Sequence, residues 1–163
     1  MQGKKKPEIK KKDVINAREA SVSEFAANLN VIITSIHQKN KRDDDMQAIK
    51  DKIDVVRKEN PVGLIEMAGP YLWKYKEKIG SENVSFFLNN SFEEDIEKAR
   101  EESQLAEITE YEEIPALLNK VKRTWHSFTP PEQQIIVKRI KALLANYAKY
   151  LSASRTLKAS ESL

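Results

Sequence analysis

Apolar residues recur every three or four positions in four separate segments of this 163-residue chain. This period constrains the fold more than any other feature, because it matches one face of an α-helix. A chain of this length is also long enough to bury a substantial core. The four stripes consist of Phe25, Leu29, Ile32, Ile33 and Ile36; Met46, Ile49, Ile53 and Val56; Leu118, Val121, Trp125 and Phe128; and Ile136, Ile140, Leu143, Tyr147 and Leu151.

Three Ser/Thr-x-x-Glu patterns predict where helices begin. In such a capping box the two side chains satisfy backbone N–H groups at the helix start. Helices are therefore predicted over residues 21–39, 92–103 and 130–152. The three boxes are Ser21 with Glu24, Ser91 with Glu94, and Thr129 with Glu132.

Two further starts follow from other capping signals. The acidic run of Asp43 to Asp45 places negative charge at the positive end of a helix that should end near Glu59. Asn60 and Pro61 fit an N-cap followed by the first helical position. Residues 114–128 are predicted to be helical, with Pro115 in the first turn.

Glycine and proline make the middle of the chain irregular. Gly69-Pro70 is predicted to interrupt the third helix, since proline lacks an N–H and crowds the preceding turn. Gly80 is a natural terminator of its second half. Residues 84–88 fit either an extended segment or a short helical turn, and residues 106–113 either a loop or a frayed helix. We therefore predict an all-α fold of five to seven helices in an irregular bundle or orthogonal array.

Charge is distributed very unevenly along the chain. The net charge is +3, but residues 1–12 carry +5, residues 91–113 carry −8 and residues 114–163 carry +7. Such asymmetry favours contacts between complementary charges, within one molecule or between copies. Residues 1–12 read as a mobile Lys-rich tail, 13–154 as a single helical domain, and 155–163 as a flexible C-terminal tail.

The absence of cysteine excludes disulfides, thiolate metal sites and cysteine nucleophiles. No apolar run approaches the roughly 20 residues that cross a bilayer, and the N-terminal lysines are not followed by the apolar stretch of a secretory signal. We therefore expect no membrane insertion and a place on the cytosolic or nuclear side of the cell.

No motif indicates catalysis. His37 and His126 stand outside any zinc-binding spacing, and Asp43 to Asp45 lack the alternating order of a calcium loop. Phosphate-binding glycine loops and the Gly-x-Ser-x-Gly elbow are absent. A dense acidic run predicts a solvated face, or one docked on basic residues, rather than an acid–base pair. We expect no enzymatic activity, cofactor or metal. The run comprises Glu93, Glu94, Glu97, Glu101, Glu102, Glu107, Glu110, Glu112 and Glu113.

Basic and aromatic residues supply the candidate contact sites. Tyr71, Trp73 and Tyr75 alternate with lysines, a pattern that can stack bases and hold phosphates. Trp73 lies off the face that carries Leu72 and Ile79, so it either meets a partner or joins a second core against Phe86-Phe87. The residues expected to contact a partner are Lys4, Lys5, Lys6, Lys10, Lys11 and Lys12, then Trp73, and then Lys138, Arg139, Lys141 and Lys149.

The phrase NPVGLIEMAGPYLWKYKEKI, followed by VSFFLNNSFEEDI, resembles a segment of small uncharacterised helical proteins of large nucleocytoplasmic DNA viruses. It covers residues 60–96, and its most specific parts are Gly69-Pro70-Tyr71-Leu72 and the run from Phe86 to Asn90. The resemblance implies a virus-encoded helical protein and a minor virion component. It carries no catalytic residues.

Two functions follow from the sequence. The first is a non-enzymatic structural or interaction protein, in the viral setting a minor capsid-associated component, assembling through complementary charged faces. Its partners would be other proteins, including capsid proteins, or copies of itself, and its location the virion. The alternative is a nucleic-acid-binding accessory protein that places the Lys-rich tail and the basic C-terminal helix on phosphates.

Overall fold

The computed structural model describes residues 10–90, 92–106 and 113–161. These residues form eight α-helices and one 3₁₀ turn and contain no strand, which confirms the all-α prediction. The helix count exceeds the predicted five to seven because two short helices occupy the irregular middle of the chain. The elements are α1 (Lys11–Lys39), α2 (Asp44–Glu59), α3 (Pro61–Lys74), α4 (Lys76–Gly80), α5 (Val84–Asn89), α6 (Glu93–Ala106), α7 (Glu113–Thr124), the 3₁₀ turn η1 (Trp125–Ser127) and α8 (Pro130–Glu161).

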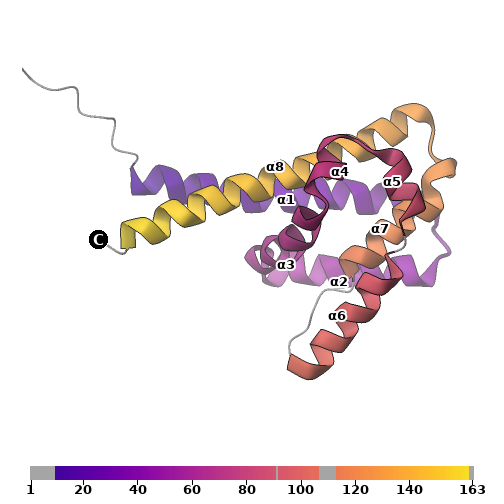
Figure 1. Cartoon of the computed structure of the whole chain (residues 1–163), viewed down its shortest axis with the longest axis horizontal. Helices are drawn as coiled ribbons and strands as arrows, with labels where there is room; N and C mark the ends of the chain where they lie inside the picture. Colours follow the sequence, from indigo (N-terminus) through magenta and orange to yellow (C-terminus); the bar gives the residue numbers. More distant parts are fainter. Residues whose placement is uncertain (1–9, 91, 107–112, 162–163) are drawn as a thin grey trace, which may run out of the picture.

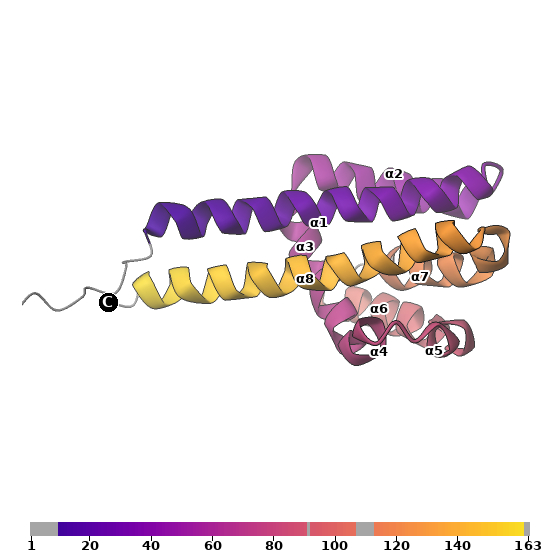
Figure 2. The same ribbon diagram turned by 90° about the horizontal axis from the view of Figure 1, so that it is seen from above.

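The two longest helices, α1 and α8, lie side by side and antiparallel along the whole molecule (Figures 1 and 2). Buried residues recur on each helix in steps of three and four, with one step of seven in α1, which is the spacing by which paired helices interlock. The shorter helices gather around one end of this pair and form a head. The other end, residues 11–20 of α1 and 152–161 of α8, projects beyond the head, and we call it the stalk. On α1 the buried series is Val14, Ser21, Phe25, Asn28 and Ile32; on α8 it is Leu143, Asn146, Tyr150, Ala153 and Leu157.

Both long helices extend beyond their predicted bounds. Helix α1 begins at Lys11 rather than Ser21, so Ser21 is not a cap: its hydroxyl donates to the Ala17 carbonyl at 2.9 Å inside the helix. Helix α8 continues to Glu161, through most of the segment predicted to be a flexible tail. The physical reason is mutual support, since Val14 packs in one cluster with Ala153 and Leu157.

The head contains the main core, to which α1, α2, α3, α7 and α8 contribute. Helix starts in the head agree with the predicted caps. The Asp43 carboxylate accepts from the N–H groups of Asp45 and Met46, and the Asn60 side chain accepts from the Gly63 N–H at 3.0 Å. Fully buried side chains in this core include Phe25, Ile53, Leu64, Ile65, Phe92 and Leu117.

Helix α3 corrects the prediction that Gly69-Pro70 interrupts it. The helix passes through Pro70, which is exposed, and ends at Lys74. Gly69 serves packing instead, because a Cβ atom there would lie 2.1 Å from Tyr147 Cδ1 of α8. Gly80 does not adopt the left-handed conformation of a terminator; Glu82 does, with φ of 55°.

Predictions were also made for α5, α7 and the start of α8. Residues 84–88 belong to the short helix α5, one of the two expected alternatives. Helix α7 carries Pro115 in its first turn, and the stripe that ends at Trp125 and Phe128 is buried. The Thr129–Glu132 capping box is formed in both directions, at 2.9 and 3.4 Å. Ser91 and residues 107–112 lie outside the described residues.

Candidate interaction surfaces

The four cations predicted on the last helix have different environments. Arg139 Nη1 donates to Asn28 Oδ1 at 2.9 Å and so joins α8 to α1. Lys141 Nζ lies 3.8 Å from Glu82 Oε1. Lys138 and Lys149 are exposed and have no hydrogen bond or ion pair to a described residue. Helical spacing places these two on the side of α8 opposite Tyr147, so they face away from the head.

The predicted N-terminal lysines that the structure describes lie near the C-terminal end of α8. Lys10, Lys11 and Lys12 are exposed at the start of α1, while Lys4, Lys5 and Lys6 lie outside the described residues. Because α1 and α8 are antiparallel, the start of α1 lies beside the end of α8, where Arg155 is also exposed (Figure 2). Two segments more than 140 residues apart in sequence thus form one basic stalk tip.

Trp73 does not lie on this basic surface. Its ring meets that of Tyr147 edge to face, with centroids 5.8 Å apart, and the Lys76 ammonium lies 4.8 Å from its centroid. Trp73 is half-buried and packs against the main core. The structure therefore favours the packing alternative for this residue, although its partner is Tyr147 rather than Phe86 or Phe87.

The acidic helix α6 lies on the far side of the head from α8 (Figure 1). Glu94, Glu97 and Glu101 are exposed and have no hydrogen bond or ion pair to the rest of the described chain. Three residues of the acidic segment form ion pairs with cations of the head: Asp95 with Lys74, Glu93 with Arg123, and Glu113 with Lys52. Among the described residues, the acidic segment forms no ion pair with the predicted cations of α8.

Asp95 differs from its acidic neighbours because it holds α6 onto α3. Its carboxylate accepts hydrogen bonds from the hydroxyls of Tyr71 (2.7 Å) and Tyr75 (2.6 Å) and from Lys74 Nζ (3.0 Å). Burial raises the pKa of Asp95, but the three hydrogen bonds outweigh burial and hold it below the usual value. Burial and the bond to Asp95 raise the pKa of the Tyr71 hydroxyl. The cluster is fully bonded, which fits a structural clamp.

A charged groove lies between α2, α6 and α7. Glu113 is buried and pairs with Lys52, yet its Oε2 atom has no hydrogen-bond partner among the described residues. Lys120 forms ion pairs with Asp43 at 2.6 Å and Asp45 at 3.9 Å across the groove. The hydrogen bond from Lys120 lowers the pKa of Asp43. These pairings fix α7 to α2. The capping role that the sequence predicted for the Asp43–Asp45 run comes from the Asp43 carboxylate, which accepts from the N–H groups of Asp45 and Met46.

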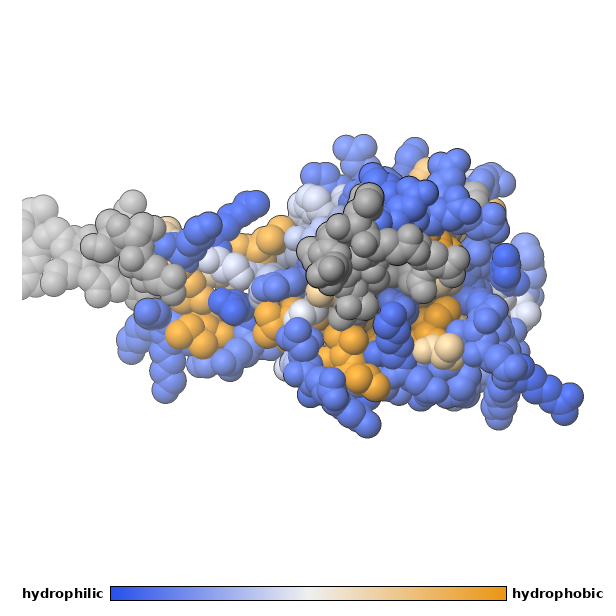
Figure 3. Space-filling view, turned by 90° about the horizontal axis from the view of Figure 1, so that it is seen from below, coloured by the Kyte–Doolittle hydropathy of each residue, from blue (hydrophilic) through white to orange (hydrophobic). Residues whose placement is uncertain are grey.

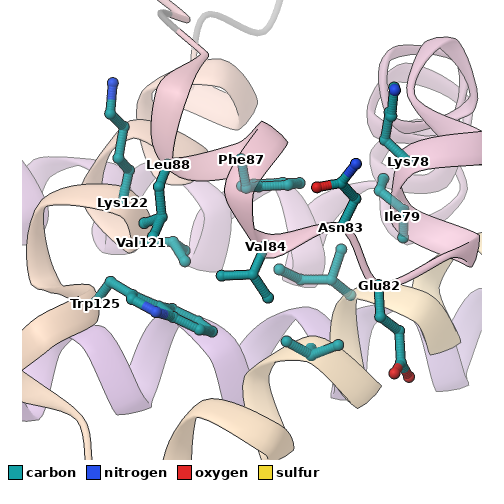
Figure 4. Close-up of a pocket in the computed structure, with 12 residues that line it drawn as sticks. Lys78, Ile79, Glu82, Asn83, Val84, Phe87, Leu88, Val121, Lys122 and Trp125 are labelled. Atoms are coloured by element: carbon teal, nitrogen blue, oxygen red, sulfur yellow. The ribbon is translucent and has the colours of Figure 1, made fainter.

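An apolar cavity between α5, α7 and α8 encloses only about 40 Å³ (Figure 4). This is room for one or two water molecules, far below the 300–1,000 Å³ of typical ligand pockets. Its walls include Phe87, Leu88, Val121 and Trp125. The cavity fits imperfect packing of a short helix rather than a substrate site.

The histidines occupy unrelated places in the structure. His37 Nε2 lies 2.7 Å from the side-chain oxygen of Gln47, and His126 is exposed in the 3₁₀ turn. Among the described residues, no group of three metal-ligating side chains lies close enough to hold an ion, and no helix has the length and apolar character needed to cross a membrane.

Sequence reasoning missed a polar network at the centre of the long helix pair. Asn28 Nδ2 donates to Asn146 Oδ1 at 2.8 Å, and Asn146 Nδ2 donates to Glu24 at 3.1 Å. Both asparagines are buried, so the pairing fixes the register of α1 against α8. In the sequence, each asparagine interrupts an apolar stripe. This interruption predicts a pairing of the two residues only once α1 and α8 are known to be neighbours.

The chain matches no protein-family model, no curated protein sequence and no solved structure.

Proposed function

We propose that this chain is a non-enzymatic interaction protein that assembles through complementary charged surfaces. The supporting observation is the placement of unpaired cations and unpaired carboxylates on opposite sides of one molecule. Lys138 and Lys149 are exposed on α8, and Glu94, Glu97 and Glu101 are exposed on α6; α8 and α6 lie on opposite sides of the head (Figure 1). Each set lacks a partner within the described chain.

The geometry makes a second copy the simplest acidic partner. Two surfaces of opposite charge on opposite sides cannot meet within one molecule, but the basic surface of one copy can meet the acidic helix of the next. Such a contact is heterologous, so it adds copies head to tail instead of closing a dimer. The basic stalk tip with Lys10, Lys11 and Lys12 enlarges the attractive field. A role in a viral particle rests on the sequence resemblance alone and is the setting we propose for such assembly.

A pair of charge-reversed variants tests this proposal. Lys138→Glu/Lys149→Glu removes the basic surface, and Glu94→Lys/Glu97→Lys/Glu101→Lys removes the acidic one. In sedimentation velocity at low salt, the wild-type chain should form oligomers that raised salt disperses, and neither variant should form them alone. A mixture of the two variants should form oligomers again, with the variants alternating, because one variant then has two acidic surfaces and the other has two basic ones.

The control variant is Lys41→Glu/Lys58→Glu. Both lysines are exposed on the head and form no ion pair with a described residue, so their reversal changes the net charge without altering either surface. A wild-type chain that stays monomeric at low salt would contradict the proposal. So would oligomers that the control variant disperses as strongly as the test variants do.

Nucleic-acid binding is the second candidate, favoured by the same unpaired lysines. A phosphate backbone on α8 would give a salt-dependent association without sequence preference. Titration of labelled duplex and single-stranded nucleic acid in a salt series decides between the candidates. Micromolar binding that Lys138→Glu/Lys149→Glu abolishes would favour nucleic acid as the partner. Trp73 is not expected to contribute, because it packs against Tyr147.

A further inference from the structure

Helix α5 covers the apolar cavity of the head, yet none of its residues is fully buried. Val84, Phe86, Phe87 and Leu88 are all half-buried, although apolar side chains of this size usually lie inside a protein. In Figure 4 the Val84 side chain points toward the wall that carries Trp125. A cavity of about 40 Å³ remains in this region, so α5 gains less contact with the wall than close packing would give.

Partly exposed apolar side chains alone do not make α5 unusual, because the view from below shows apolar surface along the stalk and on the head as well (Figure 3). What sets α5 apart is the backbone at its two ends. Before the helix, Glu82 has the left-handed φ of 55°, which residues with a side chain rarely adopt. After it, Asn90 is extended, with φ of −82° and ψ of 137°. The helix is therefore a separate unit between two non-helical residues.

Few polar contacts hold α5 in its closed position. Lys122 Nζ donates to the Asn90 carbonyl oxygen at 2.9 Å. The ion pair between Lys141 and Glu82, at 3.8 Å, is exposed and contributes little. Asn90 Nδ2 is buried and has no hydrogen-bond partner among the described residues, which makes the closed position less favourable.

Aromatic contacts supply much of the remaining attachment. Phe86 meets Tyr75 with ring centroids 5.8 Å apart, and Phe87 meets Phe92 at 5.5 Å. Isolated helices shorter than about 12–15 residues are marginal in water, so a six-residue helix that loses these contacts also loses its helical structure. We propose that α5 is a lid, which opens by local unfolding between Glu82 and Asn90 while the rest of the head stays folded.

Opening of the lid changes the surface of α8 in two ways. It uncovers cavity walls formed by Trp125 of η1 and by Val137 and Ile140 of α8. It also separates Glu82 from Lys141, the residue that follows Ile140. An apolar surface beside the basic one thus becomes available only in the open state. The lid is a property of a single copy and does not depend on the charge-driven assembly proposed above.

Native-state hydrogen exchange tests whether α5 opens as a unit. The amides of Phe86, Phe87 and Asn90 donate hydrogen bonds that exist only in the closed lid. Their protection factors should agree within about threefold and lie about a hundredfold or more below those of amides in the middle of α8. Val84→Ile adds one methylene toward the cavity and should raise all three protection factors by about fourfold. Val55→Ile is the matched control and should leave them unchanged, because Val55 is 51% exposed on α2.

Three outcomes of this experiment would overturn the lid. Protection of α5 equal to that of α8 would mean that α5 opens only when the whole molecule unfolds. Unrelated protection factors at the three amides would indicate fraying of individual residues. An equal response to Val84→Ile and Val55→Ile would show that the cavity does not control opening.

A thiol reporter tests whether opening uncovers the cavity wall. The chain has no cysteine, so a single introduced thiol can be followed without background. Ile140→Cys places it under the lid, and Ile36→Cys, in the fully buried core of α1, is the matched control. Under native conditions a small thiol reagent should modify Ile140→Cys about tenfold or more faster than Ile36→Cys, and addition of Val84→Ile should slow only the former. Circular dichroism confirms that both variants keep their helices. Equal modification rates would show that the wall stays covered, and the lid would be rejected.

Discussion

The head and the stalk are built from the same two long helices but differ in how many neighbours those helices have. In the head, α1 and α8 are covered by α3 and flanked by α2, α4 and α7, and residues such as Phe25 and Ile36 are fully buried. In the stalk each helix has only the other, and the buried cluster is limited to Val14, Ala153 and Leu157, each 8% exposed. We therefore expect the two ends of one continuous helix to differ in local stability.

The largest effect should come from the closest packing in the head. Gly69→Ala would place a Cβ atom 2.1 Å from Tyr147 Cδ1, so the Tyr147 ring would have to move away from Trp73. We expect the free energy of unfolding, measured by urea denaturation, to fall by about 3 kcal/mol. Gly80→Ala is the control: nothing lies within 4 Å of the new Cβ, so a change within about 0.5 kcal/mol is expected. Equal losses in both variants would show that the close approach of Tyr147 does not set the cost.

A matched pair of valines compares the two regions directly. Val121 is 2% exposed in the head and Val14 is 8% exposed in the stalk. Val121→Ala should cost about 2–3 kcal/mol of unfolding free energy, because rigid neighbours leave a cavity. Val14→Ala should cost about 1 kcal/mol, because the stalk can close around the change or open locally. Denaturation of both variants under one condition gives the comparison, and equal costs would show that the stalk is as tightly packed as the head.

The same contrast explains which parts of the fold could be predicted from sequence. Caps that act within a few residues were predicted correctly, as Asp43, Asn60 and the Thr129–Glu132 box show. The Ser21–Glu24 pattern misled because residues 11–20 have few apolar side chains and are helical through pairing with α8, more than 120 residues away in sequence. No local pattern contains that information.

Gly69 and Pro70 show a second limit. A Gly-Pro step predicts a break, yet Pro70 lies on an exposed part of α3 and Gly69 makes room for Tyr147. For the contact surfaces, the sequence identified the cations of α8. It did not show which of them bond within the chain, as Arg139 does to Asn28, and which stay unpaired among the described residues, as Lys138 does. Which residue meets a partner depends on the rotation of the helix in the fold.

Substitutions in the asparagine network test what aligns the two long helices at their centre. Asn146→Ala leaves Asn28 Nδ2 without its acceptor and the Glu24 carboxylate without its donor, while Asn28 Oδ1 keeps its bond from Arg139; we expect a cost of about 2 kcal/mol. Asn28→Leu/Asn146→Leu removes both buried amides and should cost less than Asn146→Ala alone. Urea denaturation measures the loss in each variant. Asn28→Leu and Asn146→Leu, each made alone, complete the comparison. A double variant whose cost equals the sum of these two would show that the asparagines do not act as a pair.

The smallest effect is a pH dependence that belongs to the head. The pKa of Asp95 is lower in the folded chain than its usual value of 3.8. The clamp therefore contributes its full stability above that pH and loses it as the pH falls through the folded value. Asp95→Asn should lower the unfolding free energy at neutral pH by about 1 kcal/mol and flatten its acid dependence. Glu94→Gln, one residue away at an exposed and unpaired position, should leave both unchanged. Thermal unfolding followed by circular dichroism from neutral to acidic pH measures the two slopes. If Asp95→Asn and the wild-type chain lose stability in parallel as pH falls, the clamp does not hold α6 on α3, and the acidic helix is attached to the head through its packing on α7 alone.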